Sequence, residues 1–293
     1  MAYNKLCSSL LITWYLVMNL EQLFHHCFIC DQIGDGDLFP AGGNNYFHSA
    51  VPLKVEIDFA NFYENFNGLA EHCLKSANND NDWKNWAKEY SDSVDLELLT
   101  TLQAFTFACH HNFMKNPPDA SGRIVSYKDE AKPPKLSDLF AKNQAECVEY
   151  SLLAKKFLDD HQIESQIMSG EMLRNYVPDG DNFTSAHTFL IIKHKDKEFI
   201  FDPANPSFSE EGTPILNLSK PCKSLSSQID RLKQSSFMVE AENIITHRKT
   251  FYGVGCLANI YEKDMIFSEG SAPQIWCKYV ERRTKNAGDF PDF

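Results

Sequence analysis

The alternation of apolar and polar positions is clearest in the middle of the chain. Residues 145–160, AECVEYSLLAKKFLDD, carry small and apolar side chains at three- and four-residue steps, which predicts an amphipathic helix. Residues 163–171, IESQIMSGE, predict a strand that leaves at Gly170. Two further apolar runs, HTFLII at 187–192 and EFIFD at 198–202, predict strands joined by the polar KHKDK. This order predicts a helix packed on an antiparallel sheet, which is an α+β fold.

The pattern before this segment is mostly helical. Residues 55–110 keep apolar side chains at helical spacing, and Pro117 with Pro118 ends the last of these helices. We therefore expect a mostly helical N-terminal region over residues 1–130, followed by a core with a C-terminal extension over 131–293. The pattern is equally compatible with one compact unit. After Pro206 we expect a loop to about residue 224 and a helical stretch near 225–240.

The N-terminus carries thirteen mostly apolar residues, LCSSLLITWYLVM at 6–18. This length is that of a signal-peptide core, and it is too short to span a bilayer. The helical stripe continues past Met18 to Phe24, and no small-residue cleavage site follows. The pattern favours a packed helix, and a cleaved signal peptide remains the alternative.

Composition excludes some classes of function. A net charge of −12 argues against nucleic-acid binding, which depends on Lys and Arg, and against an anionic membrane surface. We expect no stable membrane insertion. Nine cysteines form no regular framework, which favours a reducing, cytoplasmic compartment over a disulfide scaffold. The sequence suggests no cofactor.

The two strands at 187–192 and 198–202 predict a hairpin with polar chemistry at its open end. His187 and Asp202 are equally distant from a turn centred between His194 and Lys195. If the loop has an even number of residues about that centre, the two are direct cross-strand partners that point to the same face. A carboxylate there would accept a hydrogen bond from the imidazole and orient it.

The helix at 145–160 brings a thiol to the same region. Cys147, Ser151 and Ala154 form a stripe of small side chains, which would let the helix approach the sheet closely. A cysteine in the first turn of a helix is favoured as thiolate by the helix dipole. A thiolate paired with an imidazolium is the nucleophile of cysteine acyl-transfer enzymes. The backbone amide of Cys147 is the natural oxyanion donor, and the side chain of Gln144 is a second candidate.

This segment resembles the transglutaminase-like superfamily of papain-like folds. The resemblance covers about a quarter of the chain, from Ser137 to Pro206. It rests on a Cys opening a helix, a following strand that ends in Gly, the His of SAHTFLII and the Asp-Pro of FIFDPANP. The resemblance implies that Cys147 is the nucleophile, His187 the general base and then acid, and Asp202 the orienting carboxylate.

The family's reactions share a thioester intermediate, so the triad alone does not separate them. We expect a hydrolase acting on protein amide bonds, a peptidase or glutamine deamidase, with a protein or peptide substrate. A transglutaminase and an inactive binding module of the same fold are the alternatives. The helical N-terminal region is similar to additions on enzymes that bacteria inject into host cells, which implies a host protein as substrate and secretion into a host cell.

Other residues depart from this pattern or compete with it. Glu146 and Val148 flank the cysteine where many family members have Gly or Trp, and a carboxylate there would oppose a thiolate. Cys109, followed by two histidines, is a rival nucleophile, but adjacent helical residues point in different directions. His25, His26, Cys27 and Cys30 crowd together on an apparently helical stretch, which does not suit a zinc site. We therefore expect no metal.

Overall fold

The computed structural model describes residues 29–30, 32–40, 54–127, 132–173, 184–221 and 237–254. It is a mixed fold of helices and an antiparallel sheet, which confirms the α+β prediction. The helices are η2 (Phe59–Asn61), α2 (Tyr63–Asn79), α3 (Asn81–Lys88), α4 (Leu96–Phe113), α5 (Ala120–Ser126), α6 (Leu136–Ala141) and α7 (Cys147–Asp160). The strands are β1 (Ile29–Cys30), β2 (Leu38–Pro40), β3 (Lys54–Glu56), β4 (Ser165–Leu173), β5 (Thr184–His194), β6 (Lys197–Phe201), β7 (Ser207–Phe208), β8 (Pro214–Ile215), β9 (Leu218–Pro221), β10 (Phe237–Asn243) and β11 (Lys249–Val254).

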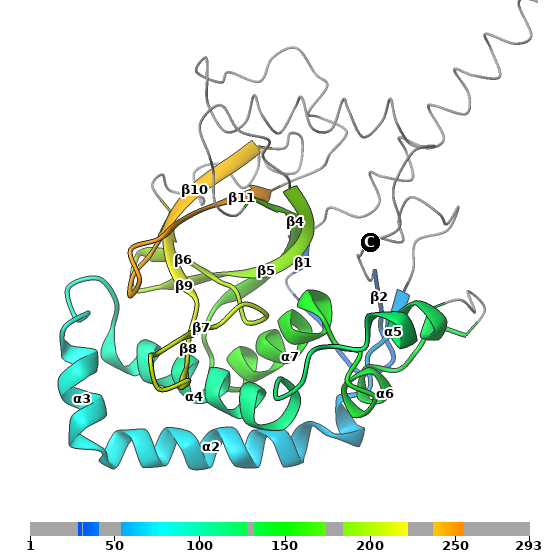
Figure 1. The fold of residues 1–293 in the computed structure, drawn as a ribbon, viewed down its shortest axis with the longest axis horizontal. Helices are drawn as coiled ribbons and strands as arrows, with labels where there is room; N and C mark the ends of the chain where they lie inside the picture. Colours follow the sequence, from blue (N-terminus) through cyan, green and yellow to red (C-terminus); the bar gives the residue numbers. More distant parts are fainter. Residues whose placement is uncertain are drawn as a thin grey trace, which may run out of the picture.

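The main sheet closes on itself. Its strand order is β1-β4-β11-β10-β9-β6-β5, and an additional β4–β5 pairing joins its two sides, as the ring of strands in Figure 1 shows. Every pairing in this sheet is antiparallel. The helices lie together on one side of the ring. Closure leaves few unpaired strand edges.

The hairpin of β5 and β6 turns one residue later than the sequence suggested. The observed pairs run from Leu190–Phe201 to His194–Lys197, so the turn residues are Lys195 and Asp196. Both have positive φ, 47° and 61°, as a two-residue hairpin turn requires. The prediction that His187 and Asp202 are direct partners is therefore wrong. This register puts Asp202 across from Phe189, on the same side as His187, because a shift of two residues keeps the face.

Strand β5 is apolar on both faces because each face meets a different cluster. Leu190 and Ile192 belong to the larger cluster, which also contains the buried apolar side chains of the helices. Phe189 and Ile191 belong to a second cluster, whose members all come from strands of the closed sheet. The prediction of a buried central strand is confirmed, since β5 is paired on both sides and residues 187–192 are all buried.

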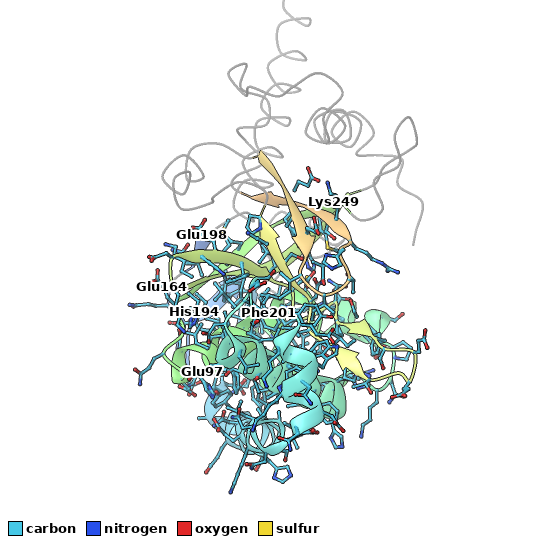
Figure 2. All side chains as sticks on the ribbon, turned by 90° about the vertical axis from the view of Figure 1, so that its left-hand side faces the viewer. Glu97, Glu164, His194, Glu198, Phe201 and Lys249 are labelled. Atoms are coloured by element: carbon cyan, nitrogen blue, oxygen red, sulfur yellow. The ribbon has the colours of Figure 1, made fainter. Side chains whose placement is uncertain are left out.

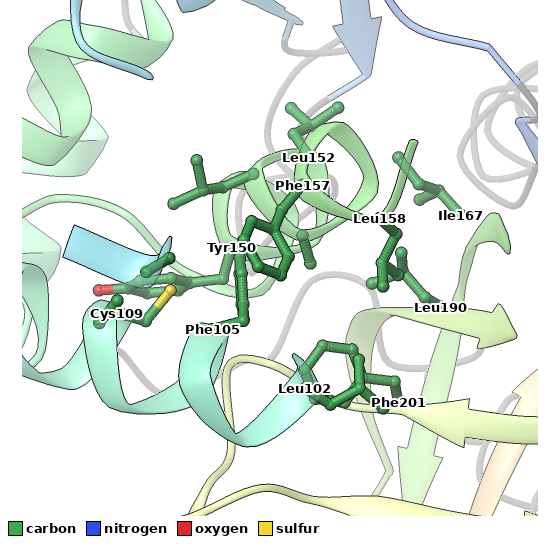
Figure 3. Close-up of a cluster of buried hydrophobic side chains, with 14 of the residues drawn as sticks. Leu102, Phe105, Cys109, Tyr150, Leu152, Phe157, Leu158, Ile167, Leu190 and Phe201 are labelled. Carbon is green, nitrogen blue, oxygen red and sulfur yellow. The ribbon is translucent and has the colours of Figure 1, made fainter. Parts of the chain in front are cut away.

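Helix α7 packs on the sheet, against β5 and β4, and also contacts α4. Figure 3 shows Phe157 and Leu158 of α7 among Phe105 of α4, Leu190 of β5 and Phe201 of β6. Phe105 lies 5.3 Å from Phe157 and 5.9 Å from Phe201 between ring centroids. Because buried apolar area drives packing, this interlocked cluster fixes the position of α7 on the strands.

The helical N-terminal part shares this cluster. Phe66 of α2 and Val55 of β3 belong to the same core as Leu218 of β9. The charged side chains Glu97, Glu164 and Lys249 lie exposed at the periphery, whereas Phe201 lies inside (Figure 2). A domain boundary near residue 130 stays a prediction.

Several local expectations need correction or lie outside the described residues. β4 continues past Gly170 to Leu173, since residues beyond the glycine still pair with β5 and β11. Residues 237–240 begin strand β10 rather than ending a helix, and 222–236 lie outside the described residues. Residues 29–30 are a strand and not helical, because they pair with β4.

The apolar run at 6–18 lies outside the described residues. Over the part of the chain that the structure describes, no helix has the length and apolar character needed to cross a membrane.

Candidate active site

Cys147 is the first residue of α7, as the sequence predicted. The preceding turn is held by a capping box, in which Glu149 Oε2 accepts from the backbone N–H of Glu146 at 2.8 Å. One turn further, Ser151 Oγ donates to Thr188 O of β5 at 3.0 Å. Residues four apart share a helix face, so this bond turns Cys147 towards β5. The thiol is half-buried.

His187 and Asp202 meet where the hairpin opens. Pairing between β5 and β6 ends at Leu190–Phe201, and both residues lie just beyond that pair. His187 Nε2 lies 2.8 Å from Asp202 Oδ2, and Asp202 is 0% exposed. Cys147 also acts on this imidazole, because it contributes to the raised pKa of His187. Since Nε2 is used by Asp202, Nδ1 is the nitrogen left for the sulfur. The structure thus brings the three predicted residues together.

The surroundings of His187 favour its charged form. Burial alone would lower the pKa of this imidazole, but the charge and hydrogen bond of Asp202 and the contact with Cys147 raise it to about 10. The imidazolium therefore keeps its proton over the physiological range. A charged, oriented imidazole beside a thiol can donate a proton to a leaving group.

The raised pKa of His187 predicts a titration that depends on Asp202. We expect the ring signals of His187 in NMR to stay those of an imidazolium up to neutral pH and beyond, and to titrate near pH 10. In Asp202→Asn the stabilising negative charge is lost while burial remains, so the pKa should fall below its wild-type value. Asp159→Asn, which removes a carboxylate on the far turns of α7, is the control and should leave the signal unchanged. A pKa of His187 that is equal in Asp202→Asn and wild type would contradict this electrostatic account.

A buried ion cluster lies beside the first turn of α7. Arg123 of α5 contacts Glu149 at 2.8 Å between Nη1 and Oε2, and Glu146 at 3.2 Å between Nε and Oε2. Tyr127 donates its hydroxyl to Glu149 Oε1 at 2.7 Å. Burial raises the pKa of Glu146 and Glu149 adds to this shift, while Arg123 opposes it. The carboxylate next to Cys147 thus shares one guanidinium with Glu149, and burial still leaves the pKa of Glu146 raised.

Gln144 is bound to α5 and its N-cap. Its Oε1 accepts from Ser126 Oγ at 2.7 Å, and its Nε2 lies 3.4 Å from Asp119 Oδ2. Gly122 allows this approach, because a Cβ there would meet Gln144 Nε2 at 2.2 Å. The amide is thus engaged with protein groups. A role of Gln144 as oxyanion donor stays a prediction, and the first-turn amide of Cys147 has no partner within its own helix.

Sequence reasoning missed two groups of this site. Asn205 donates Nδ2 to both oxygens of Asp202, at 2.9 and 3.0 Å. A signal was present, because an Asp three residues before an Asn, with a proline between them, is typical of a polar turn. Arg123 gave no such signal, since it reaches Glu149 only through the packing of α5 on α7.

The alternative sites have different surroundings. Cys109 is 0% exposed, and burial raises the pKa of its thiol well above the usual value, which disfavours a nucleophilic thiolate. Within the described ranges, no three His, Cys, Asp or Glu side chains are grouped to hold a metal ion. His25, His26 and Cys27 lie outside those ranges.

Comparisons with protein-family models, with curated proteins and with solved structures each find no match to this chain.

Proposed function

We propose that this protein is a cysteine-dependent hydrolase of the papain-like, transglutaminase-like fold that acts on protein amide bonds. The observation that carries the proposal is the arrangement around His187. Its imidazole lies 2.8 Å from Asp202, and Cys147, which begins a helix, contributes to the raised pKa of the ring. The residues also occur in the order of the resembling family.

In the first half of the reaction, the sulfur of Cys147 attacks the substrate carbonyl as a thiolate. The carbonyl oxygen takes the negative charge, and we expect the first-turn amide of α7 to donate to it. His187 then gives its proton to the leaving nitrogen, and the carbon–nitrogen bond breaks. The products of this half are an amine, or ammonia from a glutamine, and a thioester on Cys147.

In the second half, neutral His187 takes a proton from an attacking water, which breaks the thioester. The substrate leaves as a carboxylic acid, and the proton returns the triad to its starting state. Asp202 stays ionised and stabilises the imidazolium at both stages. An amine in place of water would give a transferase. The segment expected to contact substrate is 174–183, between the end of β4 and the start of β5, which lies outside the described residues.

Selective alkylation tests whether Cys147 is activated. The wild-type protein is treated with iodoacetamide at about pH 6, where ordinary thiols are protonated and slow, and the labelled cysteines are mapped by mass spectrometry. We expect Cys147 to be labelled before Cys73, a half-buried thiol on α2 whose pKa is raised by burial. His187→Ala should remove this preference. Equal slow labelling of both thiols would favour a binding module without catalysis.

A second experiment identifies the reaction. A lysate is treated with wild type or with Cys147→Ala, and the two samples are compared by peptide mass spectrometry. New chain termini indicate proteolysis, glutamine converted to glutamate indicates deamidation, and joined peptides indicate transfer. Identical changes with the alanine variant would refute the proposed function.

A further inference from the structure

Asn205 is the side chain that completes the surroundings of the Asp202 carboxylate. Its Nδ2 lies 3.0 Å from Oδ1 and 2.9 Å from Oδ2 of Asp202, and 3.3 Å from Nε2 of His187. The turn Asp202-Pro203-Ala204-Asn205 holds it there, with Asn205 N donating to Asp202 O at 3.4 Å. The amide of Asn205 thus lies within hydrogen-bond distance of both His187 and Asp202.

The hydrogen-bond roles in this group are determined by the charges. With His187 protonated, Nε2 donates to Asp202 and cannot accept from Asn205 as well. The Asn205 amide therefore donates to the carboxylate, which is fully buried and needs donors. In this state Asn205 holds the carboxylate in the rotamer that faces the imidazole.

The same amide carries an acceptor that the wild-type site does not use. Rotation about the last side-chain bond would exchange Nδ2 and Oδ1, and would place an oxygen near Nε2 of His187. While Asp202 is ionised, this rotation is opposed because it would bring two oxygens together. Without the carboxylate, the opposition disappears. An amide oxygen is a competent partner for the histidine, as Cys-His-Asn sites demonstrate.

We propose that Asn205 is a positioning residue with two roles: it holds Asp202 in place, and it takes over the orientation of His187 when Asp202 is absent. This inference rests on the proposed function. Asp202 and Asn205 together then orient His187, and Asn205 partly replaces Asp202 when the carboxylate is removed. Its signature is non-additivity, because Asn205 should matter more when Asp202 is missing.

A double-mutant cycle tests this proposal. The rate of Cys147 alkylation by iodoacetamide is measured in wild type, Asn205→Ala, Asp202→Ala and the double variant. Asn205→Ala should lower the rate about threefold in the wild-type background, as for one lost hydrogen bond. It should lower the rate about 30-fold in the Asp202→Ala background, a coupling of about tenfold. Asn205→Asp should restore part of the rate in Asp202→Ala, because it supplies a carboxylate near the ring.

Two controls separate positioning from folding. Asn61 makes the same kind of bond to an aspartate three residues earlier, with Nδ2 2.8 Å from Asp58 Oδ2, at a distant place in the fold. Asn61→Ala should leave the alkylation rate unchanged in both backgrounds. Asn205→Leu replaces the amide with an apolar group of similar size, so it should behave like Asn205→Ala if packing is kept.

The outcome remains decisive if the proposed function fails. If wild-type Cys147 shows no His187-dependent alkylation, the cycle is read from the His187 ring signals in NMR, which need no catalysis. A change in the Nε2 proton signal on Asn205→Ala that is larger in the Asp202→Ala background supports the positioning role. Equal effects of Asn205→Ala in both backgrounds, by the readout used, overturn the proposal.

Discussion

Cys147→Ala and His187→Ala are each expected to lower kcat on the protein's substrate by about 10⁴-fold or more. Neither residue works alone. Without His187, no imidazolium protonates the leaving group. Without Cys147, no thioester forms for His187 to help hydrolyse. The double variant should therefore be little slower than either single one. Asp202→Ala should retain more activity, because His187 keeps its contact with Cys147 and Asn205 remains close to the ring.

This prediction is measured as kcat on the first substrate identified from the lysate comparison. Cys73→Ala is the matched control, since it removes another free cysteine from α2, away from the triad, and should keep wild-type kcat. If the effects of the two single variants multiplied in the double variant, Cys147 and His187 would act in separate steps. The common thioester mechanism would then be wrong.

Arg123→Met is expected to lower the free energy of unfolding by about 3–5 kcal/mol, the usual cost of removing one partner from a buried ion pair. Glu149 is 0% exposed and would keep only Tyr127 and the amide of Glu146 as donors. Burial lowers the pKa of Arg123, but its acidic neighbours more than compensate, so the guanidinium stays charged. The substitution also removes the hydrogen bond from Arg123 Nη1 to Gln144 O, at 2.7 Å, beside the start of α7.

The measurement is chemical unfolding at equilibrium, combined with the rate of Cys147 alkylation. In the double variant Arg123→Met with Glu149→Gln no buried charge is left alone, so we expect it to be more stable than Arg123→Met. Lys135→Ala is the control for an exposed pair, since Lys135 lies 3.7 Å from Glu56 at the surface and should cost less than about 1 kcal/mol. An Arg123→Met protein as stable as wild type would mean that the cluster does not support α7.

The local elements were predictable because each depends on a short stretch of sequence. The helix with Cys147 in its first turn and the two buried strands beside it are confirmed. The side-chain period of a strand is two, so an error of two residues in the hairpin register still placed His187 and Asp202 on one side. The register itself was missed because Lys195-Asp196 lacks the Asn-Gly or Asp-Gly pattern that usually marks such a turn.

The partners of the site were harder to predict. The carboxylate of Glu146 suggested repulsion of a thiolate, and its ion pair with Arg123 of α5 was not visible in the local sequence. The closing pairing of β4 with β5, and the return of β11 to β4, also join distant segments. Such contacts follow from the packing of whole elements, and no local pattern records them.

The sequence by itself determined the secondary structure around the candidate site and the chemical types and order of Cys147, His187 and Asp202. These follow from periodicity and side-chain chemistry, which act over a few residues. The tertiary structure decided that a sulfur, an imidazole and a carboxylate from a helix, a strand and a turn meet in one place, with Asn205 and Arg123 as their neighbours. That convergence depends on strand register and on burial of a shared apolar core, which are properties of the whole chain.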